Sequence, residues 1–186
     1  MRIVAGRFKG HTLAGPRSDA IRPTSDRLRE TIFNVLAHAY DDPVMGARVL
    51  DLFAGTGALG LEAVSRGAAF ALLVDDGAEA RGLIRTNTDA LGAGGLTRIF
   101  RRDATKLGAA KPLEPFSLLF CDPPYGKGLA EKALAAARDG DWLTSDALVV
   151  VEEVASAEVQ LPQGFRLLER RDYGDTQVLF GQRESV

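Results

Sequence analysis

Cysteine, histidine and long apolar runs are all scarce in this sequence of 186 residues. The single cysteine, Cys121, cannot form an internal disulfide, which fits a reducing compartment. No stretch of about 18 uninterrupted apolar residues is present, so we expect no membrane span. The residues after Arg2 lack the apolar core of a secretory signal. His11 and His38 have no metal-ligand spacing. These absences predict a cytoplasmic protein without a metal ion.

Charge is nearly balanced over the whole chain but not along it. The net charge is −2, yet the first 30 residues hold seven basic and three acidic side chains, which leaves −6 for the remainder. Such asymmetry fits an arm that meets phosphate and fits a solvated tail equally well. Hydrophobic residues at 46% and charged residues at 26% are ordinary globular values. We therefore expect one domain, in which residues 1–40 form a basic N-terminal arm and helix and residues 41–186 form the main body.

The pattern of apolar residues predicts an α/β fold. Thr24 and Ser25 are helix-capping residues ahead of a helix that continues to Ala39. From Arg48 onward, short apolar strands alternate with amphipathic helices, which indicates a mostly parallel, Rossmann-like sheet with helices on both faces. Two further strands read as an antiparallel C-terminal hairpin, so we expect seven strands and a small N-terminal extension. The predicted strands are 49–53, 70–74, 97–100, 116–121, 147–151, 165–171 and 177–180, and the later helices are 58–66, 80–91 and 129–138.

A glycine-rich loop follows the first predicted strand. Gly55, Gly57 and Gly60 fit the G-x-G-x-x-G pattern, in which glycines let the backbone turn tightly and approach a ligand. A carboxylate at Asp75, after the second strand, could bind a ribose diol. These features alone suit a dinucleotide as well. Asp51 favours a different ligand, because a carboxylate there would repel a pyrophosphate and suits the ammonium group of S-adenosylmethionine.

The loop and its flanking acids resemble the Rossmann-like S-adenosylmethionine-dependent methyltransferases, whose first motif has the form D-x-F-x-G-x-G. The resemblance implies that Asp51, Phe53, Gly55 and Gly57 form this motif and that residues 41–186 are the methyltransferase domain. It further implies an adenine contact at Asp103 and Ala104, after the third strand. Asp75 and Asp76 are alternatives for the ribose contact.

The segment Asp122-Pro123-Pro124-Tyr125 directly follows the fourth predicted strand. An exocyclic amine is a hydrogen-bond donor, and the Asp122 carboxylate and Pro123 carbonyl are acceptors that can align its lone pair with a methyl donor. Tyr125 offers a flat face on which a base can stack. Amino-methyltransferases resemble this sequence at all four positions, so we take Asp122, Pro123 and Tyr125 as the candidate catalytic residues.

Nearly the whole chain resembles the bacterial small-subunit rRNA guanine-N2 methyltransferases of the RsmD type. The segments that carry the resemblance are Arg2–Gly6, Arg22–Thr24, Leu28–Asn34, Asp51–Glu62, Asp122–Tyr125 and Tyr173–Thr176. The family usually has glutamate where this chain has Asp75-Asp76, and the shorter side chain would loosen ribose binding. The resemblance implies methylation of 16S rRNA, at guanine 966, by a monomer that acts on assembled or assembling small subunits.

The basic arm is the natural place for contacts to that rRNA. Phosphate contacts from lysine and arginine are independent of sequence and sensitive to salt. A solvated helix face is the alternative interpretation for the arginines of the first helix. The candidate RNA-binding residues are Arg2, Arg7, Lys9, Arg22, Arg27 and Arg29.

Three other functions compete with this interpretation. A DNA adenine-N6 or cytosine-N4 methyltransferase would use the same four-residue motif but usually needs a target-recognition segment. A nicotinamide oxidoreductase would explain the glycines and leave Asp51 and the segment 122–125 without roles. A non-catalytic ribosome-assembly factor would have no use for the intact motifs.

Overall fold

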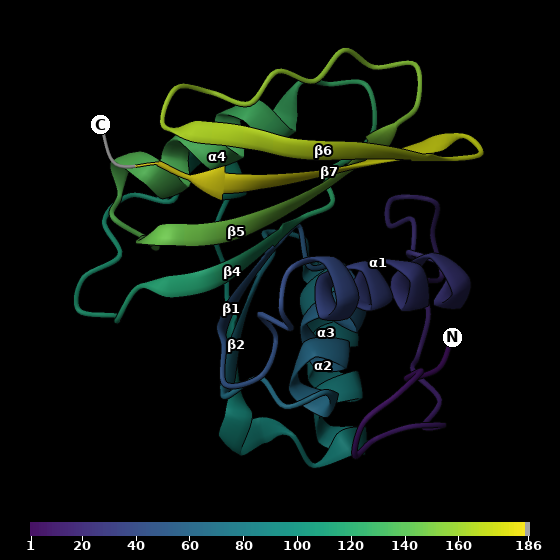
Figure 1. Cartoon of the computed structure of the whole chain (residues 1–186). Helices are drawn as coiled ribbons and strands as arrows, with labels where there is room; N and C mark the ends of the chain where they lie inside the picture. Colours follow the sequence, from purple (N-terminus) through teal and green to yellow (C-terminus); the bar gives the residue numbers. More distant parts are fainter. Residues whose placement is uncertain (185–186) are drawn as a thin grey trace.

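The computed structural model describes residues 1–184 and contains one seven-stranded sheet, in the order β3-β2-β1-β4-β5-β7-β6 (Figure 1). Strands β1 to β5 pair in parallel, whereas β5 with β7 and β7 with β6 pair antiparallel. The mostly parallel sheet with an antiparallel C-terminal hairpin is therefore confirmed. The strands are β1 Arg48–Leu52, β2 Phe70–Val74, β3 Thr97–Phe100, β4 Phe116–Cys121, β5 Leu143–Val154, β6 Phe165–Tyr173 and β7 Thr176–Arg183.

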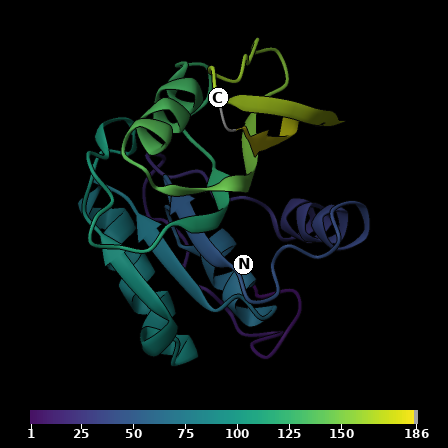
Figure 2. The same cartoon turned by 60° about the vertical axis from the view of Figure 1, so that its left-hand side comes forward.

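Helices cover both faces of the sheet, as expected. They are α1 Asp26–Ala39, α2 Ala58–Ser65, α3 Ala78–Leu91 and α4 Leu129–Asp139, with short 3-10 helices η1 Gly94–Leu96 and η2 Ala104–Lys106. Because successive side chains of a strand point to opposite faces, the core divides into two clusters. One cluster packs under α1, α2 and α3, and the other packs under α4 and η2. In Figure 2, α1 at the right and α4 at the upper left lie on opposite sides of the sheet.

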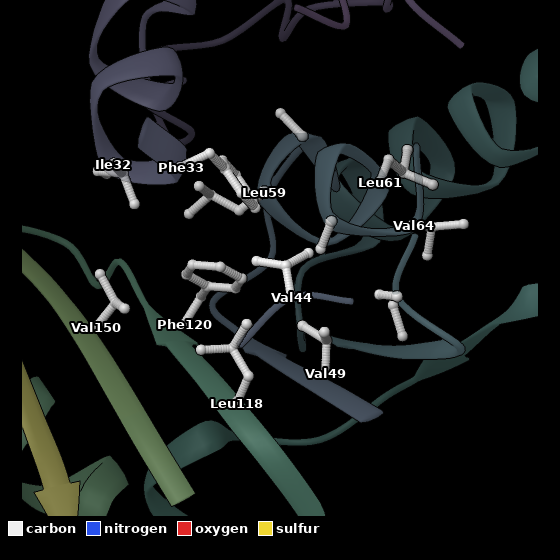
Figure 3. Close-up of a cluster of buried hydrophobic side chains, with 14 of the residues drawn as sticks. Ile32, Phe33, Val44, Val49, Leu59, Leu61, Val64, Leu118, Phe120 and Val150 are labelled. Atoms are coloured by element: carbon white, nitrogen blue, oxygen red, sulfur yellow. The ribbon is translucent and has the colours of Figure 1, made fainter. Parts of the chain in front are cut away.

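Helix α1 is part of the main hydrophobic core. Ser25 caps its N-terminus by accepting a hydrogen bond from the Leu28 N–H. Ile32 and Phe33 point toward α2 and toward the strand residues below them (Figure 3), and the Phe33 and Phe120 rings lie 5.5 Å apart. Burying such side chains stabilises the fold by about 1.5–3 kcal/mol each. The helix therefore has a fixed position on the sheet. The division of the chain into an arm and helix (1–40) and a main body (41–186) stays a prediction. Residues 185 and 186 of that body lie outside the part of the chain that the structure describes.

The N-terminal arm is pinned to α2 by a buried carboxylate. Glu62 accepts hydrogen bonds from the Val4 and Ala5 N–H groups at 2.9 and 3.1 Å, and from the Arg29 side chain. The Arg29 guanidinium also contacts Asp26 and donates to the Arg2 carbonyl. Its side chain is fully buried. The prediction that Arg29 binds RNA phosphate is therefore wrong, because the guanidinium is already paired inside the protein.

Two element boundaries differ from the sequence-based expectation in ways that matter for the site. The first strand ends at Leu52, because Phe53 has a left-handed backbone with φ of 56°. Strand β5 extends well beyond Val151 and brings Glu152 and Glu153 into the sheet. Within residues 1–184, no helix is both long enough and apolar enough to cross a membrane.

Candidate active site

A cavity of about 760 Å³ lies at the carboxyl ends of the parallel strands. Three groups of residues line it: the segment 19–24 of the arm, the residues that follow β1, β2 and β3, and the turn after β4. Ligands of open α/β sheets bind at this edge, where the strand order reverses. The predicted site residues that line the cavity are Arg22, Asp51, Phe53, Gly55, Asp75, Asp76, Asp103, Asp122, Pro123 and Tyr125.

The loop between β1 and α2 is shaped by left-handed backbone conformations. Phe53, Gly55 and Gly57 have φ of 56°, 61° and 82°. For a phenylalanine this conformation is strained, and such strain tends to occur where surrounding contacts enforce it at functional sites. Asp75 provides one such contact, since its Oδ2 accepts a hydrogen bond from the Gly55 N–H at 3.0 Å. The loop is therefore held by the residue that follows β2.

Asp51 is the most deeply buried acid of the cavity wall. Its side chain is almost fully enclosed, and its Oδ2 accepts from the Gly60 N–H at 2.9 Å. Burial raises the pKa of Asp51 to about 7; the Gly60 hydrogen bond lowers it and the charge of Asp75 raises it. A cationic ligand group beside this carboxyl would favour its ionised form.

The acids after β2 and β3 differ in how many of their carboxylate lone pairs are used by hydrogen bonds within the protein. Asp75 accepts from Gly55 through one oxygen and from the Gly77 N–H through the other, at 2.9 Å. Asp76 is exposed. Asp103 caps η2, and its hydrogen bonds from the Thr105 hydroxyl and N–H lower its pKa. All three carboxylates line the cavity and keep lone pairs for a ligand.

Asp122 belongs to a cluster with Arg22, Thr24 and Glu152. Its Oδ1 lies 3.2 Å from Arg22 Nη2, and its Oδ2 lies 2.9 Å from Thr24 Oγ1. The same Arg22 nitrogen is 3.2 Å from Glu152 Oε1, and Thr24 Oγ1 is 3.1 Å from Glu152 Oε2. Burial, followed by the charge of Glu152, raises the pKa of Asp122 well above its ordinary value, and Arg22 opposes that rise. Two buried carboxyls thus share one cation and one hydroxyl.

Tyr125 is held at its hydroxyl, and Arg22 lies against its ring. The hydroxyl donates to Glu152 Oε1 at 2.8 Å and lies 3.0 Å from Thr176 Oγ1. The Arg22 guanidinium carbon lies 3.7 Å from the ring centroid. Burial and the interaction with Glu152 raise the pKa of Tyr125, while Thr176 and Arg22 lower it. The phenol therefore stays neutral, and its ring forms a platform for a flat, polar group.

Not all the predicted site residues meet at the cavity. Gly57 is the N-cap of α2 and lies outside the cavity lining, and Ala104 is buried beside a separate, small cavity. Arg2, Arg7, Lys9 and Arg27 are exposed on the arm and on α1. Within the described residues, no group of three potential ligands could hold a metal ion.

Sequence reasoning missed Glu152 and Thr24. Glu152 directly follows the apolar run that forms the buried part of β5, just as Asp51 and Asp75 lie at the ends of their strands. An acid directly after a buried apolar run therefore predicts a side chain at the cavity edge of the sheet, and Glu152 fits this pattern. For Thr24 the sequence pattern predicts only a helix-capping role, which the structure gives to Ser25.

The whole chain is similar to known methyltransferases. A family model described as Conserved hypothetical protein 95 matches residues 1–182. The ribosomal RNA small subunit methyltransferase D of Escherichia coli strain K12 is 39% identical over 187 residues, which cover 100% of this chain and 91% of that protein. The solved structure of yhhF from Escherichia coli superimposes with a TM-score of 0.83 at 34% identity and covers 100% of this chain and 99% of its own.

A more distant structure shows the same fold. An RNA methyltransferase from Salinibacter ruber, solved in complex with S-adenosyl-L-homocysteine, has a TM-score of 0.67 at 12% identity and covers 89% of this chain and 95% of its own. The sheet order and the acid-lined cavity, together with these similarities, define a methyltransferase of the Rossmann-like class. More specifically, the chain belongs to the family of the ribosomal RNA small subunit methyltransferase D proteins.

Proposed function

We propose that this protein transfers a methyl group from S-adenosylmethionine to the exocyclic N2 amine of a guanine in 16S rRNA. The observation that carries the proposal is the meeting of Asp122, Pro123 and Tyr125 with the three strand-end acids in one cavity. The family relationship supports the same reaction, since relatives carry the name ribosomal RNA small subunit methyltransferase D. The proposed substrate implies a cytoplasmic site of action, and we propose that the protein acts as a monomer.

The cavity suits S-adenosylmethionine, which supplies an electrophilic methyl group. A volume of about 760 Å³ is within the range of about 300–1,000 Å³ that small-molecule sites occupy. We assign the amino-acid end of the cofactor to Asp51, with Phe53, Gly55 and Gly57 forming the loop beneath it. Asp75 or Asp76 would hold the ribose, and Asp103 and Ala104 the adenine. The Salinibacter structure contains the product form of this cofactor in the same fold.

Asp122, Pro123 and Tyr125 would position the target amine. The Asp122 carboxyl and Pro123 carbonyl accept the two amine hydrogens, and the Tyr125 ring stacks on the base. The amine lone pair then forms the new bond to the methyl carbon as the carbon–sulfur bond breaks. Once methylated, the amine is acidic enough to lose a proton to the neighbouring carboxyls. Alignment supplies most of the rate in this proposal.

The exposed cations of the arm and α1 would position the ribosomal substrate. We propose that Arg2, Arg7, Lys9 and Arg27 contact phosphates, and that Arg22 contributes a further charge at the mouth of the cavity. Recognition would then depend on these contacts and on the shape of the assembled or assembling small subunit.

The test is transfer of labelled methyl to small ribosomal subunits that lack the modification, beside naked 16S rRNA and duplex DNA. We expect label on subunit rRNA, recovered as N2-methylguanosine, and its loss in Asp122→Ala. Asp139→Ala, at an exposed position on α4, is the control and should retain activity. Label on adenine or on DNA would instead favour a base methyltransferase of the DNA type. Wild-type protein that binds S-adenosylhomocysteine but labels nothing would contradict the proposal.

A further inference from the structure

The planar guanidinium group of Arg22, which carries only hydrogen-bond donors, lies next to Asp122 in the cavity. Its guanidinium carbon is 3.7 Å from the centroid of the Tyr125 ring, a distance typical of stacked planar groups. Its Nη2 group lies 3.2 Å from both Asp122 Oδ1 and Glu152 Oε1. The structure therefore has a planar guanidinium on an aromatic ring, with its N–H edge toward two carboxyls.

The edge of guanine that carries the reactive amine has the same chemistry. N1, N2 and N3 of guanine surround C2 as a guanidine unit, in which the ring N1–H and an exocyclic N2–H are adjacent donors that point the same way. Adenine and cytosine present an unprotonated ring nitrogen beside their amine, so this neighbour is an acceptor. A pair of acceptors at the site suits guanine and repels the ring nitrogen of the other two bases.

Glu152 is held as an acceptor in this position. Its side chain is 2% exposed, and its carboxyl is fixed by hydroxyl groups of Tyr125 and Thr24. The Thr24 hydroxyl has one hydrogen but lies within hydrogen-bond distance of both carboxyls. The Thr24 hydroxyl can therefore donate to only one of the two carboxyls at a time. Arg22 Nη2 lies against Asp122 Oδ1 and Glu152 Oε1, so both oxygens can accept hydrogens from a base once Arg22 leaves.

We propose that Glu152 is a specificity-determining residue, which accepts the ring N1–H of the target guanine in the place that Arg22 occupies in the structure. The proposal rests on the proposed function, because it assigns the base that the same site takes. Arg22 has a side chain that is 46% exposed and can leave toward solvent. Its departure removes one donor from the buried Glu152 Oε1, and the N1–H of guanine replaces that donor, whereas adenine and cytosine have no hydrogen on the corresponding ring nitrogen.

The test uses a base that keeps the amine and loses the N1–H. Small subunits are reconstituted with 16S rRNA that carries either guanine or 2-aminopurine at the methylated position, and kcat/KM is measured for each. We expect the wild-type protein to prefer guanine by at least about a hundredfold. Glu152→Gln, whose amide can donate to the unprotonated N1, should narrow the preference to less than about tenfold.

Glu153→Gln is the matched control. Glu153 is the next residue and is equally buried, but its carboxyl accepts from the Gly126 and Val154 N–H groups. Its variant should keep the wild-type preference, and titration with S-adenosylhomocysteine checks that all three proteins are folded. If Glu152→Gln loses activity equally on both bases, the role of Glu152 is overturned and the proposed function stands. The same conclusion follows if the wild-type protein shows no preference for guanine over 2-aminopurine. Wild-type transfer to another base, or to none, would overturn the proposed function and this assignment together.

Discussion

Arg29 and Glu62 form an ion pair that is completely closed to solvent. Arg29 Nε lies 3.1 Å from Glu62 Oε1, and both side chains are 0% exposed. The pair joins α1 to α2, and through Glu62 it also fixes the backbone of the N-terminal arm. The arm in turn lines the cavity with residues 19–24. A structural pair remote from the chemistry therefore supports one wall of the candidate active site.

Removal of Arg29 should destabilise the protein severely. Arg29→Ala removes the fully buried cation beside Glu62 and leaves that carboxylate with Arg66, whose Nε lies 2.9 Å from Glu62 Oε2, so we expect a loss of about 3 kcal/mol of unfolding free energy. Urea denaturation measures the change. Arg27→Ala, two residues earlier on the exposed side of the same helix, should change the stability by less than about 0.5 kcal/mol. Equal effects of the two substitutions would contradict the buried role of Arg29.

Cofactor affinity should depend on pH through Asp51. The pKa of Asp51 is about 7 in the free protein, so the carboxyl is mostly protonated below pH 7, and a cationic ammonium favours the ionised form. Calorimetry with S-adenosylhomocysteine should show affinity falling as pH decreases below about 7, by up to about tenfold per unit, and a plateau above it. Asp51→Asn should bind more weakly at pH 8 and should lose this dependence.

The same group predicts an opposite effect on the stability of the free protein. Because the folded-state pKa of Asp51 is raised above its unfolded value of 3.8, the folded state binds more protons between about pH 4 and pH 7. This carboxyl therefore destabilises the fold progressively as pH rises through that window. Asp51→Asn keeps an oxygen for the Gly60 N–H and should unfold at a higher urea concentration than wild type at pH 8. A variant less stable than wild type at pH 8 would argue against a raised pKa.

The packing of α2 on the sheet should tolerate no side chain at Gly60. A Cβ there would lie 2.3 Å from Leu73 Cδ2 and 3.1 Å from Asp51 Oδ2. We expect Gly60→Ala to lower the unfolding free energy by about 1–3 kcal/mol and to weaken S-adenosylhomocysteine binding. Gly82→Ala is the control, because a Cβ at that position of α3 meets nothing within 4 Å and should raise stability by about 0.4–1 kcal/mol.

Binding to small subunits should depend on salt through the exposed cations. Each of Arg7→Gln, Lys9→Gln and Arg27→Gln removes one proposed phosphate contact and should reduce the slope of log affinity against log salt by about one. Filter binding at several salt concentrations gives the slope. Lys132→Gln, exposed on α4 at the opposite face of the sheet, should leave it unchanged. A uniform change in all four variants would indicate a general charge effect without defined contacts.

The outline of the fold was predictable because its signals are local. Strands β2, β3 and β4 lie where their apolar runs predicted them, and the tight loop after β1 follows from its glycines. The same applies to the convergence of Asp51, Asp75, Asp103 and Asp122, because parallel strands end at one edge. The boundary of β5 was not predictable from hydrophobicity, because the strand continues through Glu152 and Glu153, whose side chains are stabilised by partners remote in sequence.

By itself, the sequence determined the sheet, the strand-end acids and the family resemblance, because each depends on residue types at short spacing. Only the tertiary structure decided what the arginines do. Arg22, Arg27 and Arg29 look alike within eight residues of chain, yet one stacks on Tyr125, one is exposed and one is buried against Glu62. Their environments are set by partners up to 130 positions away. The partners of a charged side chain are long-range contacts, and local sequence does not encode them.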